Sequence, residues 1–140
     1  MTRDDVVAVL ERQQGAMDRR DWATFRTLYA EDARVESPLG GSMQGPDAIV
    51  NGTDAFFSAF PDAVILRQPV IVDGNRAVVM AEVTGTQLGA IMGLPPSGRA
   101  FRLPTTFVFV LRDGLIVEER RIYDFTGLLI QIGVLKAKPA

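Results

Sequence analysis

The stretch from residue 99 to residue 133 constrains the fold of this chain more than any other part of it. It holds two long runs rich in β-branched and aromatic residues, separated by Asp113-Gly114. An Asp-Gly pair between such runs is the strongest short-range signal for a β-hairpin. The second run ends at Asp124, before a short apolar segment that we interpret as a helix. The sequence therefore predicts two long paired strands followed by a terminal helix.

Asp124, at the end of the second strand, has two possible roles. Successive side chains of a strand point to opposite faces, so we expect Arg120 and Asp124 to share one face and Tyr123 to lie on the other. A carboxylate in this place, followed by apolar residues, could lie at the mouth of an apolar pocket. Asp124 could equally cap the helix that follows, because Asp is favoured at the N-cap. Both interpretations stay open at the level of local sequence.

The composition is that of a single globular domain over residues 1–140. Hydrophobic residues make up 47% of the chain and charged residues 23%, and the net charge is -2. No apolar run approaches the ~20 residues that a bilayer span needs, and we find no signal-peptide pattern. We therefore expect a cytoplasmic protein that does not bind membranes. The dispersed basic residues also argue against a nucleic-acid partner.

Cysteine and histidine are both absent from the chain. Their absence excludes thiol catalysis, disulfides, a Ser-His-Asp triad and any metal site built on thiolates or imidazoles. Acid–base chemistry in this protein must therefore rely on carboxylates, Tyr, Lys, Arg or water.

Helices are predicted at residues 3–18, 22–29 and 46–60, from apolar residues three and four positions apart. Thr2 begins a capping-box pattern before the first, and Pro46 suits the first position of the third. Some aromatic residues of these apolar faces could line a cavity or simply fill the core. They are Trp22, Phe25, Tyr29 and Phe56.

The rest of the chain is mostly β, with strands expected at 33–37, 64–72 and 76–88 before the hairpin. Glu82 stands in mid-strand among apolar neighbours, so it must face solvent, pair with an Arg or serve a function. The loop after 76–88 has an apolar tip around Met92, which could be a lid or a subunit contact. Helices on one side of a strongly curved antiparallel sheet make an α+β domain, a cone with a central apolar cavity.

Several motifs in this order of elements resemble those of a known family. The motifs are Gly-Leu-Pro-Pro at 93–96, Asp-Gly-Leu-Ile at 113–116, Tyr-Asp at 123–124 and Leu-Leu-Ile-Gln-Ile-Gly at 128–133. Nearly the whole chain resembles the SnoaL-like polyketide cyclases of the nuclear transport factor 2-like superfamily. The resemblance implies a cone-shaped fold of the cystatin-like α+β barrel type.

The resemblance also implies an activity, namely an intramolecular aldol cyclisation of a small hydrophobic carbonyl compound without metal or cofactor. Asp124 would be the general base and Arg120 a second catalytic residue, because an apolar pocket can raise the pKa of a carboxyl group toward neutrality. Gln87 stands where many members carry His. The implied substrate-binding residues are Trp22, Phe25, Tyr29, Phe56, Glu82, Gln87, Met92 and Tyr123. Proteins of this kind usually form homodimers through the outer face of the sheet, and we expect the same here.

The superfamily also includes proteins with other activities, which need other residues. In ketosteroid isomerase the base and the oxyanion-binding Tyr would fall at Ser37 and Gln13, so we expect that site to be absent. An epoxide hydrolase or dehydratase would need Asp124, Arg120 and Glu82 to come together. A non-catalytic ligand-binding or dimerisation module is the alternative from a different class, and a tight Arg120–Asp124 pair would favour it.

Overall fold

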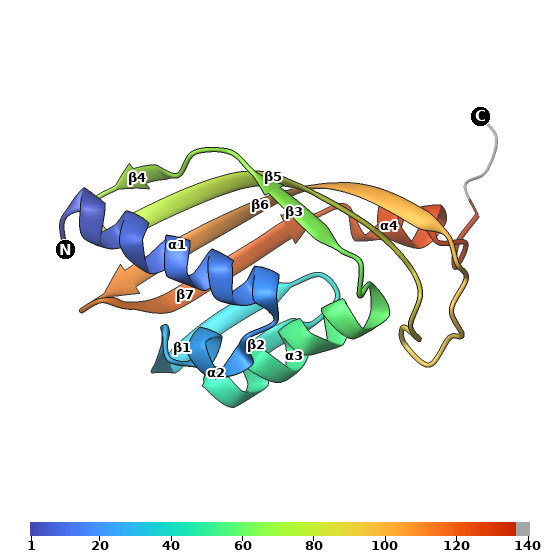
Figure 1. The fold of residues 1–140 in the computed structure, drawn as a ribbon, viewed down its shortest axis with the longest axis horizontal. Coiled ribbons are helices and arrows are strands. Elements are labelled where there is room, and N and C mark those ends of the chain that lie inside the picture. Colours follow the sequence, from blue (N-terminus) through green and yellow to red (C-terminus); the bar gives the residue numbers. More distant parts are fainter. Residues whose placement is uncertain (137–140) are drawn as a thin grey trace.

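The computed structural model describes residues 1–136, and it shows helices packed against one face of a curved sheet (Figure 1). The helices are α1 (Arg3–Arg19), α2 (Trp22–Arg26), α3 (Pro46–Ala59) and α4 (Phe125–Gln131). The strands are β1 (Tyr29–Ser37), β2 (Gly41–Gln44), β3 (Val64–Arg67), β4 (Ile71–Asp73), β5 (Arg76–Thr86), β6 (Ala100–Arg112) and β7 (Leu115–Tyr123). The predicted α+β class is confirmed.

The sheet has seven strands in the order β2-β1-β7-β6-β5-β3, and β4 also pairs with β5. All neighbours are antiparallel except β1 and β7, which run parallel. The expected antiparallel sheet is thus mixed at one place. The strand order has two ends, β2 and β3, so the sheet curves around its helices without closing into a barrel.

The predicted helices owe their positions to identifiable local interactions. Thr2 and Asp5 form the complete capping box at the start of α1, with Asp5 N–H donating to the Thr2 hydroxyl at 3.1 Å. The helix lies across the concave face of the sheet (Figure 1) and buries Val6 and Leu10 completely. Pro46 opens α3, as expected. The apolar sides of these helices and the inner face of the sheet form one core.

Three local assignments differ from the sequence prediction. The second helix is only five residues long, and Tyr29 begins β1 because it pairs with Ile116 of β7. The strand expected at 64–72 is divided into β3 and β4, since Pro69 has no N–H to continue the ladder. The Gly-rich loop after β1 contains a short strand, β2.

An extra residue in β7 decides which side chains of that strand face the interior. Val110 of β6 pairs with Glu118, but the next residue, Leu111, pairs with Ile116, so Val117 is inserted. The insertion shifts the alternation of side chains along the strand. Ile116 is fully buried whereas Ile122, an even number of residues later, is 51% exposed. Beyond the bulge, odd-numbered residues therefore point inward.

Membrane-spanning candidates are absent from the described part of the chain: none of its helices combines the length and apolar character needed to cross a bilayer.

Candidate functional site

A narrow apolar cavity lies between the inner face of the sheet, α3 and the turn that joins β1 to β2. Its volume is about 50 Å³, which holds a few water molecules. Aromatic and aliphatic side chains form most of the lining, including Phe56, Leu103 and Phe107. The polar side chains that reach it are Ser37, Thr53, Thr105, Arg121 and Tyr123. Within residues 1–136, Arg121 is the only charged residue that lines this cavity.

The guanidinium of Arg121 is the chemically distinctive group of the cavity. Its Nε donates to Glu119 Oε2 at 2.6 Å, and its Nη1 donates to the Thr53 hydroxyl at 2.9 Å. Its Nη2 is buried without a hydrogen-bond partner, and no other buried side-chain nitrogen or oxygen in residues 1–136 is left so. An unsatisfied buried donor is costly, and Nη2 is enclosed by protein atoms with almost no accessible surface of its own.

A network of buried hydrogen bonds fixes the position of the Arg121 side chain. Glu119 is fully buried, and its second oxygen accepts a hydrogen bond from the Tyr29 hydroxyl. The Tyr29 oxygen in turn accepts from Gln13 Nε2 at 3.2 Å. Burial disfavours the charged form of Arg121, but the Glu119 carboxylate outweighs it and raises the pKa of the guanidinium. Arg121 is therefore a permanent cation whose charge is matched by one carboxylate.

The two tyrosines keep their protons. Burial, followed by the charge of Glu119, raises the pKa of Tyr29 well above its usual value. Burial likewise raises the pKa of Tyr123, against the lowering effects of the Leu39 N–H and Arg121. The Tyr123 hydroxyl accepts from the Leu39 N–H at 3.1 Å, which ties the β1–β2 turn to the end of β7. Tyr123 thus presents a neutral phenol to the cavity.

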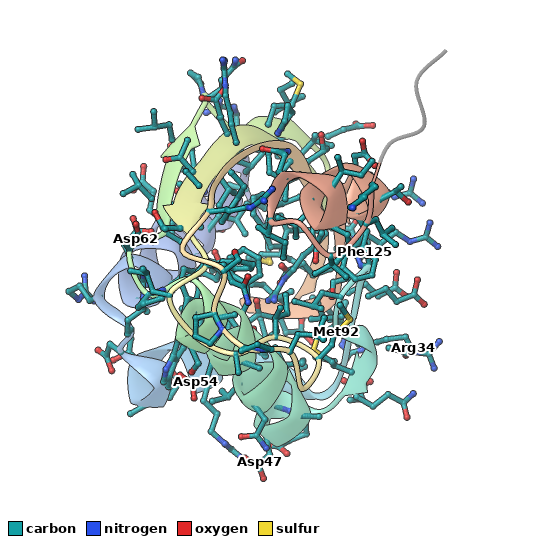
Figure 2. All side chains as sticks on the ribbon, turned by 90° about the vertical axis from the view of Figure 1, so that its right-hand side faces the viewer. Arg34, Asp47, Asp54, Asp62, Met92 and Phe125 are labelled. Carbon is teal, nitrogen blue, oxygen red and sulfur yellow. The ribbon has the colours of Figure 1, made fainter. Side chains whose placement is uncertain are left out.

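Asp124 and Arg120, the predicted catalytic residues, do not line the cavity. Asp124 is exposed and caps α4, where its Oδ1 accepts from the Gly127 N–H at 2.9 Å. Figure 2 shows the next residue, Phe125, at the start of α4. Arg120 has a 71% exposed side chain, and its nearest carboxylate is Glu36, at 4.0 Å. The bulge in β7 explains their outward direction, and the catalytic role of both stays a prediction.

Among the predicted substrate-binding residues, Phe56 and Tyr123 line the cavity. Phe25 is fully buried in the core and packs against Tyr29, with ring centres 4.9 Å apart and the rings tilted. Trp22 lies at the surface of the same aromatic cluster and donates to Asp54 Oδ1 at 3.0 Å; Figure 2 labels Asp54 on α3.

The remaining predicted residues lie away from the cavity. Glu82 forms an ion pair with Arg102 at 2.7 Å on the outer side of the sheet. Gln87 is buried and holds the loop from 87 to 99 together by donating to Pro95 O and accepting from the Ser97 N–H. Met92 is 54% exposed at the tip of that loop (Figure 2). The set Asp124, Arg120 and Glu82 is not assembled, because each binds a different neighbour.

Sequence reasoning missed Glu119 and Arg121 as site residues. The signal available was their spacing with Tyr123, which puts all three on one face of the strand. No cluster of three or more acidic side chains that could hold a metal ion occurs in the described residues.

The chain is similar to the proteins of one known family. A model of the SnoaL-like polyketide cyclase family matches residues 7–132. The chain belongs to this family. No curated protein matches it.

Solved structures support the SnoaL-like assignment. A protein from Jannaschia sp. CCS1, proposed to be a SnoaL-like polyketide cyclase, is 25% identical, with a TM-score of 0.82 over 97% of this chain and 94% of that one. IdmH, a proposed polyketide cyclase from Streptomyces antibioticus, is 26% identical, with a TM-score of 0.77 over 91% and 98% of the two chains. TerC, co-crystallised with polyporic acid, shares the fold at 15% identity, with a TM-score of 0.76 over 92% and 98%.

Proposed function

We propose that this SnoaL-like protein is an acid–base enzyme that binds a small carbonyl compound in the cavity and promotes an intramolecular aldol closure without a cofactor. The observation that carries the proposal is Arg121, a buried cation that lines a mostly apolar cavity and keeps one of its donors, Nη2, unpaired. Membership of a polyketide cyclase family supports the substrate class. Two of the similar proteins, from Jannaschia sp. CCS1 and Streptomyces antibioticus, are themselves named as proposed polyketide cyclases, which supports a cyclisation as the class of reaction.

In the proposed chemistry, Arg121 acts as the hydrogen-bond donor that polarises the substrate carbonyl. A carbonyl oxygen that accepts from Nη2 is polarised, so a proton on the adjacent carbon becomes more acidic. Removal of that proton gives an enolate, whose charge is stabilised by a fixed and largely buried cation. The enolate carbon then forms a bond to a second carbonyl carbon of the same molecule, and the resulting alkoxide takes up a proton. We assign this proton to Tyr123, a neutral phenol that lines the cavity.

Asp124 is our candidate for removal of the first proton. The family resemblance assigns it this role, and its carboxylate would have to leave the Gly127 N–H to meet a substrate at the cavity. Asp124→Asn is a suitable test variant, because Asn caps helices as well as Asp does but cannot act as a base.

A non-catalytic ligand-binding role is the second candidate. It is favoured by one observation: no carboxylate lines the cavity within residues 1–136. In that case Arg121 would hold a carbonyl ligand without any proton transfer.

Proton exchange at the acidic carbon of simple β-keto esters separates the two candidates. We expect the wild type to accelerate deuterium uptake, Arg121→Lys to reduce it by about 10²–10³-fold, and Asp124→Asn to abolish it. Arg34→Lys is the matched control and should leave the rate unchanged, since Arg34 is exposed on β1. Acceleration that survives in Asp124→Asn would remove Asp124 from the mechanism. No acceleration, together with saturable binding, would favour the binding role.

The predicted homodimer remains part of this proposal. The outer face of the sheet exposes Leu66, Met80 and Ile122, which a second copy could cover. Light scattering of the purified protein would measure its mass in solution, and a monomer would contradict the prediction.

A further inference from the structure

Ser37 and Tyr123 are the last residues of two neighbouring strands, and both line the cavity. Their strands, β1 and β7, run parallel, so the two side chains come to the same edge of the sheet. The turn that joins β1 to β2 binds both hydroxyls. The Leu39 N–H donates to the Tyr123 hydroxyl at 3.1 Å, and the Gly40 N–H donates to the Ser37 hydroxyl at 2.8 Å.

The same turn approaches Ser37 closely because position 40 is a glycine. A Cβ at this position would lie 2.9 Å from the Ser37 hydroxyl oxygen and 3.2 Å from the Met43 side chain, closer than such contacts normally are. The backbone N–H can therefore reach Ser37 only with a glycine here. Ser37 and Tyr123 are both half-buried, so their hydroxyls are fixed by the turn without being enclosed.

The protons of these two hydroxyls are not used elsewhere in the protein. The other hydroxyls of the lining, those of Thr53 and Thr105, donate to backbone carbonyl oxygens of their own elements at 2.7 and 3.1 Å. Within residues 1–136, neither Ser37 nor Tyr123 donates to a backbone carbonyl or to a carboxylate. Both act toward the turn as acceptors only.

Ser37 also lies next to Tyr123 and influences it. Burial raises the pKa of Tyr123. The Leu39 N–H and the charge of Arg121 oppose this rise, and so does a hydrogen bond from the Ser37 hydroxyl. A hydrogen bond between two hydroxyls uses only one of their two protons. At least one proton of the pair is therefore left for an oxygen atom in the cavity.

We propose that Ser37 and Tyr123 form a hydroxyl pair that donates to one oxygen atom of the ligand, which makes Ser37 a further substrate-binding residue. The inference rests on the proposed function and deepens it, because the oxygen held here is that of the second carbonyl group, the one that the enolate carbon attacks. Substrates are therefore compounds with two carbonyl groups, one of which reaches the β1–β2 turn.

The hydroxyl pair suits the charge that develops during ring closure. As the new carbon–carbon bond forms, the π electrons of the second carbonyl move to its oxygen, which becomes an alkoxide and takes the proton of Tyr123. The phenolate is stabilised by the Leu39 N–H and by Ser37, and it regains a proton from solvent. Asp124 releases to solvent the proton that it removed first, so the protons balance.

Cyclopentanone tests this site, because methylenecyclopentane has nearly the same shape and lacks only the oxygen. Ligand-observed NMR titrations of the full chain give the affinity of each compound. The labelled ring carbon that bears the hydroxyl of Tyr123 reports where the oxygen binds. The chain has two tyrosines, so Tyr123→Phe assigns this signal. We expect the ketone to move the Tyr123 signal further than the hydrocarbon does.

Removal of either hydroxyl should weaken binding of the ketone alone. Ser37→Ala and Tyr123→Phe should each lower the affinity for cyclopentanone by about 3- to 10-fold, the effect of one lost hydrogen bond, and leave the affinity for methylenecyclopentane unchanged. Ser37→Thr keeps a hydroxyl and should bind as the wild type does. Ser42→Ala, at an exposed position of β2, is the matched control.

Three results would overturn the inference. They are no binding of cyclopentanone by the wild type, equal affinities of the wild type and Ser37→Ala for it, or equal losses for both compounds, which would show that the variant only distorts the cavity. Deuterium uptake by β-keto esters judges the proposed function separately. Uptake combined with a ketone affinity independent of Ser37 would retain the proposed function and remove the hydroxyl pair. The expected losses of affinity without any uptake would retain the hydroxyl pair as a binding site and remove the catalysis.

Discussion

The sequence Glu-Glu-Arg-Arg at 118–121 places two Glu-Arg pairs of identical spacing on opposite faces of the same strand. Glu119 and Arg121 are buried, bound to each other at 2.6 Å and to the Tyr29 and Thr53 hydroxyls. Glu118 and Arg120 are exposed, and Arg120 approaches a carboxylate only to 4.0 Å. The chemistry of the residues is the same on both faces, and only the surroundings differ.

This difference shows that burial, rather than residue type, decides how strongly the loss of one charge in a pair affects the stability of this protein. Exposed pairs contribute about 0–1 kcal/mol because water screens them. A buried pair adds little as a unit, yet removing one partner leaves an uncompensated charge in the core. The inner pair is therefore sensitive to single substitutions, whereas the outer pair is not. The following predictions test this comparison.

The largest effect is expected for Glu119→Gln. The variant leaves the buried Arg121 without its carboxylate, so the free energy of unfolding should fall by about 3–5 kcal/mol. Glu118→Gln should change it by less than about 0.5 kcal/mol. Urea denaturation of both variants measures the difference. The double variant Glu119→Leu with Arg121→Met should recover most of the loss, because it removes both charges. Equal losses for Glu118→Gln and Glu119→Gln would refute the comparison.

The next largest effects on the free energy of unfolding are expected when the two isoleucines of β7 are replaced by alanine. Ile116→Ala should lower the free energy of unfolding by about 2–5 kcal/mol, because Ile116 is completely buried. Ile122→Ala should lower it by less than about 1 kcal/mol, since this side chain is half exposed. The same urea experiment applies. Similar losses at the two positions would contradict the bulge at Val117, which alone puts them on opposite faces.

The smallest effect concerns the pH dependence of stability. The pKa of Tyr29 is raised by burial and by Glu119, whereas in the unfolded chain it is about 10. Below that pH the phenol is protonated in both states and contributes no slope. Above it the unfolded state binds fewer protons, so the free energy of unfolding should fall by up to about 1.4 kcal/mol per pH unit, until the pH passes the folded pKa.

Tyr29→Phe tests this dependence on the inner face. The variant should show a shallower decline between pH 10 and 11 than the wild type, because it has no phenol to ionise at this position. Arg120→Lys, a change on the outer face, should decline as the wild type does. Urea midpoints at three pH values suffice. An unchanged slope in Tyr29→Phe would show that Tyr29 is not protected in the folded protein.

The fold could be predicted from the sequence further than the site could. The Asp-Gly turn, the capping box at Thr2 and Pro46 act locally, so the pattern alone placed the hairpin, α1 and α3. Which side chains of β7 face the core could not be predicted, because this depends on the pairing with β6 and on one inserted residue. Simple alternation assigned Asp124 and Arg120 to the face of Ile116, and the insertion turns them outward. The parallel pairing of β1 with β7 is likewise a tertiary property that no local motif encodes.

The inserted residue in β7 also bears on how the strand finds its alignment during folding. If β7 paired with β6 one residue out of step, Glu118, Arg120 and Ile122 would face the core, and the interior would again receive a Glu-Arg pair and an isoleucine. That competing alignment would lose the bond between Tyr123 and Leu39 and would bring Asp124 inward. The duplicated Glu-Arg pairs therefore do not by themselves decide the alignment of β7, whereas Asp124, which would become a buried unpaired carboxylate, and the Tyr123 hydroxyl both favour the native one.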